Sequence, residues 1–307
     1  MKSLSLIGMS KNSGKTTVLN ALLRYYSSQV LGLTSIGRDG EDRDILTHTY
    51  KPRRYVNEGT IFATAVSLLP LCDVTKEILK TTGINTPLGE VIILRARTGG
   101  YVQLAGPSIN AQVVQICQTL HGYGAHTVIV DGAFSRKTPA SPAVTECTIL
   151  CTGAAVHQNM NRVIDQTRYV HDLLKSEKIT PEIVTLTKDF PLSLVYEDGK
   201  VKGFEQAALT DALADEIIKH GVQNAQIVAE DASKFLIGLE THQRLILRKI
   251  TTKVRNSTKL IALTINPVSA SGYAFNAVDF KNSLEALVDS PVINVMEEVE
   301  LLYDLLK

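Results

Sequence analysis

Along the first 190 residues, short apolar segments typical of strands alternate with segments whose apolar residues have helical spacing. Short apolar or β-branched runs bounded by Gly, Pro, Asp or Ser predict strands at 3–8, 30–35, 91–97, 101–105, 126–131, 147–151 and 181–187. Between them, apolar residues at helical spacing predict helices at 15–29, 58–69, 72–82, 109–122 and 157–176. Strands that alternate with helices indicate an α/β fold whose mainly parallel, doubly wound sheet is covered on both faces.

The remaining chain shows a second set of elements. "RTGGYVQLAG" predicts a hairpin added antiparallel to the sheet, and "LVYEDGKVKGF" predicts another around its Asp-Gly turn. Later segments predict helices at 205–220, from 231 towards 254 and at 276–288, with strands at 225–229, 259–265 and 291–295. None of these later turns carries a glycine-rich phosphate loop. We therefore expect a nucleotide-binding domain at 1–185 and a smaller α/β domain at 186–307, which is a candidate for partner binding.

Net charge, apolar runs and cysteine spacing indicate which classes of partner and site the chain lacks evidence for. A net charge of +1 over 307 residues gives no electrostatic argument for nucleic acid or an anionic membrane. The longest apolar runs are far shorter than the roughly 20 residues of a membrane-spanning helix. The chain opens directly into a strand, so we expect a cytoplasmic protein without a membrane partner. The four cysteines show no metal-ligand spacing and are expected to be small buried residues.

The most informative motif is "IGMSKNSGKTTVLN" at residues 7–20, which is typical of a phosphate-binding loop between a strand and a helix. Its lysine, Lys15, would reach the terminal phosphates, and Thr16 would coordinate magnesium. The usual first glycine is replaced by Met9, with Gly8 one position earlier. Backbone N–H groups of the loop and of the helix start would bind phosphate. The residues expected to hold the nucleotide are Ser10, Lys11, Asn12, Ser13, Gly14, Lys15, Thr16 and Thr17.

Acidic residues supply the other parts of a nucleotide site. Asp131 follows the apolar run 127–130 and is the candidate second magnesium residue, although a helix N-cap is the alternative. Asp39 and Glu41 lie in "GRDGEDRD", after a predicted strand, and are candidates for orienting the attacking water or for a second magnesium ligand, although a solvated acidic loop is the alternative. In "TLTKDF" an aspartate stands one residue early for a guanine-reading motif, which favours ATP over GTP. We therefore expect ATP and Mg²⁺ as cofactors.

Several long segments resemble one known family. "IGMSKNSGKTTVLNALL", "GLTSIGRDGEDRD", "KPRRYVNEGTIFAT" and "VDGAFSRKTPASPAVTECTILCTGAAV" are similar to the P-loop reactivating-factor component encoded beside adenosylcobalamin-dependent lysine and ornithine aminomutases. The resemblance covers about residues 1–160. More broadly, this half resembles the P-loop group that includes dethiobiotin synthetase, in which the lysine, threonine and strand-end aspartate correspond to Lys15, Thr16 and Asp131. Members of that group commonly dimerise across the nucleotide, so a homodimer is an open expectation.

The resemblance implies an ATP-dependent accessory role. Such factors use nucleotide binding and hydrolysis to release damaged cobalamin from an aminomutase and admit fresh cofactor, together with a second ATPase subunit. The Asp-x-His-x-x-Gly motif of base-off cobalamin binders is absent from the sequence, which fits a factor that acts on a holoenzyme. The alternative is a ligase or kinase like dethiobiotin synthetase that acts on a small carboxylate. Lys51, Arg53 and Arg54 would then hold the anionic substrate.

Overall fold

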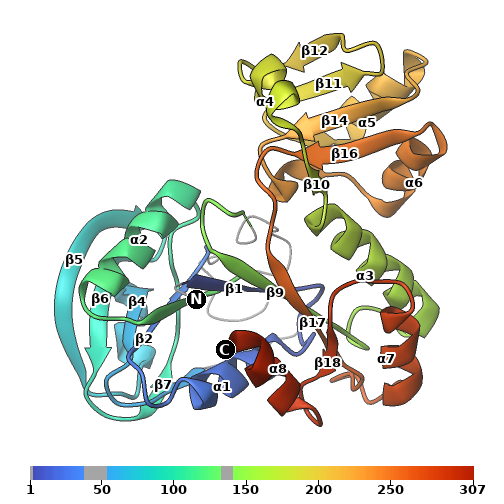
Figure 1. Ribbon diagram of the computed structural model, residues 1–307. Helices are drawn as coiled ribbons and strands as arrows, with labels where there is room; N and C mark the ends of the chain where they lie inside the picture. Colours follow the sequence, from blue (N-terminus) through green and yellow to red (C-terminus); the bar gives the residue numbers. More distant parts are fainter. Residues whose placement is uncertain (1–2, 38–53, 133–140) are drawn as a thin grey trace.

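The computed structural model describes residues 3–37, 54–132 and 141–307, and most of them are arranged around two β-sheets (Figure 1). The larger sheet has nine strands among the described residues, and one of them, the eighth in the order below, runs antiparallel to all the others. Their spatial order is β18 (Val292–Asn294), β17 (Leu260–Asn266), β9 (Cys147–Gly153), β1 (Ser3–Gly8), β8 (Thr127–Asp131), β2 (Leu31–Ser35), β4 (Ile61–Ala65), β6 (Gly89–Ala96) and β5 (Lys76–Thr86). The expected α/β fold with a mostly parallel sheet is confirmed.

Helices cover both faces of this sheet. On one face, α1 (Lys15–Tyr25) and α8 (Val299–Leu306) share a buried cluster with alternate residues of the central strands, among them Leu4 and Leu6. On the other face, α2 (Asn110–Gly122), α3 (Met160–Leu174) and α7 (Ala277–Glu285) pack against the intervening residues, such as Ile7 and Val130. Alternate residues of a strand point to opposite faces, so a strand covered on both faces is apolar throughout.

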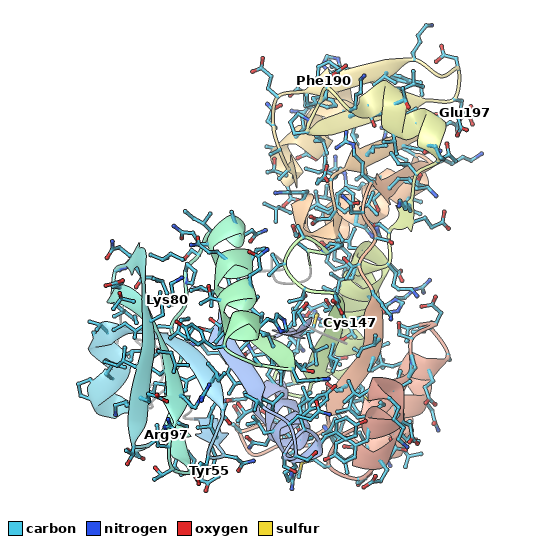
Figure 2. The ribbon with its side chains drawn as sticks, turned by 60° about the vertical axis from the view of Figure 1, so that its left-hand side comes forward. Tyr55, Lys80, Arg97, Cys147, Phe190 and Glu197 are labelled. Atoms are coloured by element: carbon cyan, nitrogen blue, oxygen red, sulfur yellow. The ribbon has the colours of Figure 1, made fainter. Side chains whose placement is uncertain are left out.

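The second sheet is built from residues between α3 and β17. Its strand order is β10 (Glu177–Lys178), β16 (Ile250–Val254), β14 (Ala225–Ala229), β11 (Leu192–Tyr196) and β12 (Val201–Phe204). Its helical segments are α4 (Pro181–Thr187), α5 (Asp211–Lys219), η3 (Ala232–Lys234) and α6 (Leu239–Leu247). Two short pairs, β13 (Leu209–Thr210) with β15 (Phe235–Leu236) and β3 (Arg54–Val56) with β7 (Gly100–Val102), complete the strands, and η1 (Val66–Leu71) follows β4. Figure 2 shows Phe190 and Glu197 in this second part, apart from Tyr55 and Arg97.

The sheets do not divide the chain at the expected position of 185/186. Strands β17 and β18 lie beyond that position, yet they extend the large sheet next to β9. The residues of the small sheet, 177–254, are therefore an excursion from the large sheet, and the chain returns to it afterwards (Figure 1). The apolar pattern of β17 shows that it is buried and does not show which sheet it joins, because β-strands of either sheet bury the same residue types.

Some predicted elements have a different structure. The predicted helices at 58–69 and 72–82 are wrong, because these residues form β4, η1 and most of β5. The predicted strand at 181–187 is wrong as well: it is helix α4, which starts with Pro181 at its first position and Glu182 in its first turn. The helix expected to run towards 254 ends at Leu247, and strand β16 follows. The hairpin predicted in "LVYEDGKVKGF" is confirmed as β11–β12.

The antiparallel addition to the large sheet forms from other strands than expected. The Gly-Gly segment at 99–100 does not join β6 to a neighbouring strand, since β6 pairs with β4 and β5 while β7 pairs with β3. Pairing between strands distant in sequence determines where β6 and β7 lie, and neither local propensity nor a short turn motif identifies the partner of a strand.

Among the described residues, no helix combines the length and apolar character needed to cross a membrane.

Candidate functional site

The loop at residues 9–14 lies between β1 and α1, at the edge of the large sheet where its parallel strands end. Helix α1 begins at Lys15, as the motif predicts, and the residue before it, Gly14, has a left-handed backbone with φ of 92°. Asn12 also has a positive φ, of 61°. No side chain caps the helix at Gly14. The first N–H groups of a helix have no partner within it, so this end offers donors and a partial positive charge to an anion.

This loop lies where the connections after two neighbouring strands lead to opposite faces of the sheet. The segment after β1 leads to α1 on one face, whereas the segment after its neighbour β9 leads to α3 on the opposite face. Open α/β sheets bind ligands at such positions, at the carboxyl ends of the strands. The loop is fixed to the neighbouring strand end, because the N–H of Met9 donates to the carbonyl oxygen of Cys151 at 2.8 Å.

Inside the loop, Ser13 has a buried hydroxyl without a hydrogen-bond partner. Its side chain is 1% exposed, and no described group lies within hydrogen-bonding distance of Oγ. A buried hydroxyl without a partner costs free energy, so such a group in a glycine-bearing loop indicates a site for a polar ligand. The backbone of Gly8 lies directly against this serine: a Cβ at position 8 would come within 2.6 Å of Ser13 Oγ and 2.9 Å of Lys15 Cδ. Gly8 therefore makes room for the loop, a role that the motif assigned to the position of Met9.

Lys15 and Asp131 come together at the mouth of the loop. The amine of Lys15 donates to the carbonyl oxygen of Gly132 at 2.8 Å, one residue after Asp131. Asp131 ends β8 and is 8% exposed, and its carboxylate accepts a hydrogen bond from the guanidinium of Arg54. Thr16 and Thr17 occupy the first turn of α1 and are partly exposed. The residues expected to hold phosphate and magnesium thus lie around one end of α1.

Two further loops border the site. The side chain of Asn266, at the end of β17, donates to the carbonyl oxygen of Asn12 at 3.3 Å, and its Cβ lies 3.1 Å from where a side chain at Gly14 would begin. The carbonyl oxygen of Asn266 accepts from the N–H of Ala154 at 2.9 Å, and the hydroxyl of Tyr273 donates to the carbonyl oxygen of Ala154 at 2.7 Å. Segments "CTGAA" and "TINPVSASGY" therefore meet beside the loop 9–14.

Asn266 was not predicted as a residue of the site. The sequence does show that Asn266 is a polar residue at the end of a buried strand. This points to the site only when β17 is known to lie next to β9. Conversely, "TLTKDF" lies at the end of α4 in the small-sheet part, and it contributes nothing to this edge of the large sheet (Figure 1).

Some predicted residues fall outside the described part of the chain. Asp39 and Glu41, proposed to orient water, belong to this group, and so do Lys51 and Arg53. Across the described ranges, no group of three or more His, Cys, Asp or Glu side chains is arranged to hold a metal ion. The four cysteines are buried, as expected, and none of them forms a disulfide bond with another described residue. Burial raises the pKa of Cys151, beneath the loop, to about 11, so this thiol stays neutral near pH 7.

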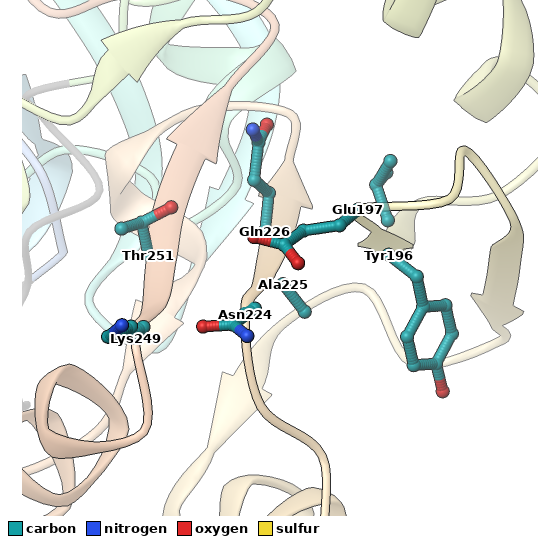
Figure 3. Close-up of a pocket in the computed structure, with 8 residues that line it drawn as sticks. Tyr196, Glu197, Asn224, Ala225, Gln226, Lys249 and Thr251 are labelled. Carbon is teal, nitrogen blue, oxygen red and sulfur yellow. The ribbon is translucent and has the colours of Figure 1, made fainter.

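A separate hollow lies in the small sheet (Figure 3). It is lined by the end of β11 and the starts of β14 and β16, and includes Glu197, Asn224 and Lys249. Asn224 and Lys249 both have left-handed backbones, with φ of 48° and 57°. The side chains of Glu197 and Lys249 are exposed, and the ring of Tyr196 points away from the others in Figure 3. The glycine-bearing loop between a strand and a helix lies at 9–14, in the other sheet, and not at this hollow.

Comparisons with models of protein families, with curated proteins and with solved structures find no significant match to this chain. The chemistry of the site must therefore be inferred from its own residues.

Proposed function

We propose that the chain binds a nucleoside triphosphate, with ATP favoured, together with Mg²⁺ at the loop 9–14 and the start of α1. The observation that carries this proposal is the buried hydroxyl of Ser13, which has no hydrogen-bond partner among the described residues and lies at a helix N-terminus that none of their side chains caps. Such a loop offers N–H donors and a helix dipole to phosphate, and Lys15 adds a full positive charge beside it.

The residues present fit a magnesium nucleotide. The hydroxyl of Thr16 and the carboxylate of Asp131 are hard oxygen ligands, which Mg²⁺ prefers, either directly or through water. The cation would neutralise charge on the phosphates. Lys15 is already at the mouth of the loop, where its amine donates to a backbone carbonyl that a phosphate would replace as acceptor. The segment "GAAV" at 153–156 contacts the end of β17 beside the loop, and these two segments are the candidates to contact the base.

We further propose that nucleotide binding and hydrolysis serve the reactivation of an adenosylcobalamin-dependent aminomutase. This narrower role is supported by the sequence resemblance over about residues 1–160. The small-sheet part, residues 177–254, is a second body of structure outside the large sheet and is available to contact a mutase or a second ATPase subunit. In this account, the nucleotide site supplies the energy and the partner enzyme supplies the damaged cofactor.

The test is reactivation of a cobalamin-inactivated lysine or ornithine aminomutase with ATP, Mg²⁺ and fresh adenosylcobalamin. Addition of the wild-type chain, with its second subunit where one is required, should restore mutase activity, and Lys15→Ala should abolish the effect. Lys80→Ala is the matched control, because Lys80 is an exposed lysine of β5 in the large sheet, outside the part proposed to contact a partner. Nucleotide binding without any effect on mutases would contradict the reactivation role.

A second candidate is a ligase or kinase that acts on a small carboxylate. The position of Arg54 favours it: one of the three basic residues considered for an anionic substrate does reach Asp131, next to the phosphate-binding loop. This function predicts ATP turnover that depends on a small carboxylate and not on a protein partner. A screen of ATP hydrolysis against a panel of carboxylates distinguishes the two.

A further inference from the structure

Two cationic side chains converge on consecutive residues at the mouth of the phosphate-binding loop. Lys15, from the start of α1, donates to the carbonyl of Gly132, and Arg54, from β3, contacts the carboxylate of Asp131. The two cations come from elements far apart in sequence. Lys15 has a role in the phosphate-binding motif, whereas Arg54 has none.

The pair between Arg54 and Asp131 is shielded from water. The side chains are 15% and 10% exposed, in contrast to most other ion pairs of the described residues, which lie at the surface. Removing one partner from a buried pair leaves an uncompensated charge. Asp131 therefore keeps its contact with Arg54 until another cation takes the place of the guanidinium. Arg54 is positioned by β3, whose three residues pair with β7 in an antiparallel ribbon.

The proposed magnesium site requires the same carboxylate. A guanidinium bonded to Asp131 occupies oxygen lone pairs that Mg²⁺, or a water molecule of its shell, would need. Binding of Mg²⁺ would therefore release Arg54 close to Lys15, where the terminal phosphates are expected. Guanidinium groups bind phosphate oxygens in a bidentate manner, with well-defined geometry.

We propose that Arg54 holds Asp131 in place of Mg²⁺ in the ligand-free protein and, once displaced, binds the terminal phosphate of a triphosphate. This inference rests on the proposed nucleotide site and adds a residue that discriminates triphosphate from diphosphate. Arg54 then has two consequences of opposite sign: it opposes Mg²⁺ binding and it favours the triphosphate.

Calorimetric binding of ADP and of the non-hydrolysable analogue adenylyl imidodiphosphate, each over a range of Mg²⁺ concentrations, separates these effects. In Arg54→Gln, the Mg²⁺ concentration that gives half-maximal ADP binding should fall several-fold, and the preference for the triphosphate analogue should fall about tenfold. Arg54→Lys, which keeps the charge and loses the bidentate geometry, should retain the opposition to Mg²⁺ and lose part of the preference. Arg97→Gln is the control, since it removes an arginine whose pair with Glu77 is exposed.

The contrary result is a structural role alone. If Arg54→Gln lowers the unfolding temperature while the Mg²⁺ midpoint and the triphosphate preference both stay at wild-type values, the inference is overturned. If the wild type binds neither nucleotide, the proposed function fails. Binding of Mn²⁺ alone, followed by electron paramagnetic resonance, then tests the first part. Arg54→Gln should bind Mn²⁺ more tightly than wild type, the double variant with Asp131→Asn should lose that gain, and equal binding by all three would contradict the proposal.

Discussion

At the residue scale, the close approach of Gly8 to the loop yields the first prediction. In Gly8→Ala the new Cβ would displace Ser13 Oγ or the stem of Lys15, both of which are side-chain atoms able to shift. We therefore expect nucleotide affinity at least tenfold weaker, with a loss of unfolding free energy below about 1 kcal/mol, as for other small adjustments. Equilibrium titration and urea denaturation measure the two quantities.

The matched control for this substitution is Gly122→Ala. Gly122 ends α2, and a Cβ there meets no atom within 4 Å. Alanine is the better helix former by up to about 1 kcal/mol, so stability should stay equal or rise slightly. Unchanged nucleotide affinity in Gly8→Ala would show that the tight packing at this position has no role in binding.

The thiol of Cys151 gives a second prediction at this scale, concerning pH. Burial raises its pKa to about 11 in the folded chain, from a value of 9.0 for an unperturbed thiol. The folded state thus disfavours the thiolate. The contribution of the neutral Cys151 thiol to the free energy of unfolding is therefore fully present below pH 9 and is lost as the pH rises towards 11. Between pH 8 and 10.5 this group should cost about 2 kcal/mol of unfolding free energy. Urea denaturation at the two pH values should show a smaller loss in Cys151→Ala, and an identical loss would contradict the assignment.

Individual residues of the candidate site were predictable to different degrees. Lys15, Thr16 and Asp131 were identified from local pattern, because a motif records the residues that neighbour each other along one strand, turn and helix. The roles of Asn266 and Arg54 were not, since each depends on a partner distant in sequence, and the role of Gly8 depends on how the loop folds back against it. Arg54 lies 77 positions from Asp131, and Asn266 lies 254 positions from Asn12.

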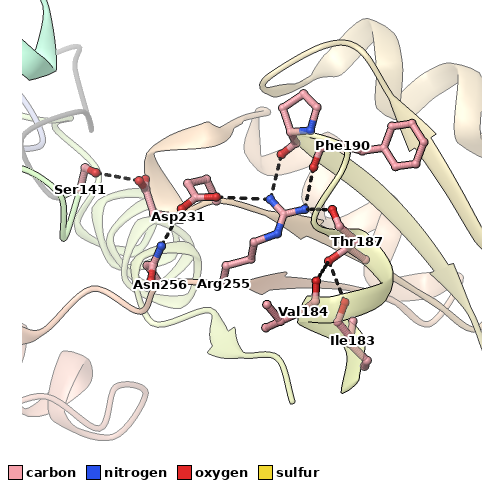
Figure 4. A network of polar contacts seen from close by, with 10 residues as sticks. Ser141, Ile183, Val184, Thr187, Phe190, Asp231, Arg255 and Asn256 are labelled. Carbon is pink, nitrogen blue, oxygen red and sulfur yellow. Dashed lines mark hydrogen bonds and ion pairs between the residues drawn. The ribbon is translucent and has the colours of Figure 1, made fainter. Parts of the chain in front are cut away.

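At the element scale, a buried polar contact ties the two sheets together (Figure 4). The hydroxyl of Ser141, which precedes β9, donates to Asp231 Oδ2 at 2.7 Å, and Oδ1 of the same carboxylate accepts from the N–H of Ser233 at 2.8 Å. Asp231 is 3% exposed. Nearby, the guanidinium of Arg255 donates to the carbonyl oxygens of Thr187 and Phe190 at 2.6 and 2.7 Å and so ties the end of α4 to the strand edge. Side chains thus join segments that no shared strand connects.

The third prediction concerns this contact. Asp231→Ala leaves the hydroxyl of Ser141 and the N–H of Ser233 buried without their acceptor, which should lower the unfolding free energy by about 1–3 kcal/mol. Asp198→Ala, at the exposed turn of the β11–β12 hairpin, is the control and should change it by no more than about 0.5 kcal/mol. Chemical denaturation of the variants gives the comparison. Equal stability of the two variants would mean that Asp231 does not hold the sheets together.

Elements were predicted well where local pattern and tertiary position agree. The strand–loop–helix at residues 3–25 and the hairpin β11–β12 are examples, and in the hairpin Gly199 supplies the positive φ, of 80°, that its turn requires. Prediction failed at β4, where all five residues are buried, because burial on both sides removes the alternation that identifies a strand. It failed at α4 because the β-branched residues were given more weight than the proline at the helix start.

At the scale of the whole molecule, the large sheet gathers both ends of the chain around one site. Strand β1 supplies the loop, β8 supplies Asp131, and β17 returns from the small-sheet part to place Asn266 beside Asn12. The overall class was predictable from alternating strands and helices, whereas the return of the chain was not. The order of strands depends on which strand edges pair with each other, and this pairing is established only in the folded sheet.

The central claim is that the loop at 9–14 holds a magnesium nucleoside triphosphate, and equilibrium binding of ATP with Mg²⁺ tests it most directly. Titration calorimetry should detect binding to the wild type and to Lys80→Ala with equal affinity. Lys15→Ala should keep the wild-type unfolding temperature and bind at least tenfold more weakly, because it removes a charge-assisted contact to phosphate. Equal affinity in Lys15→Ala and wild type, or no binding to either folded protein, would contradict the account.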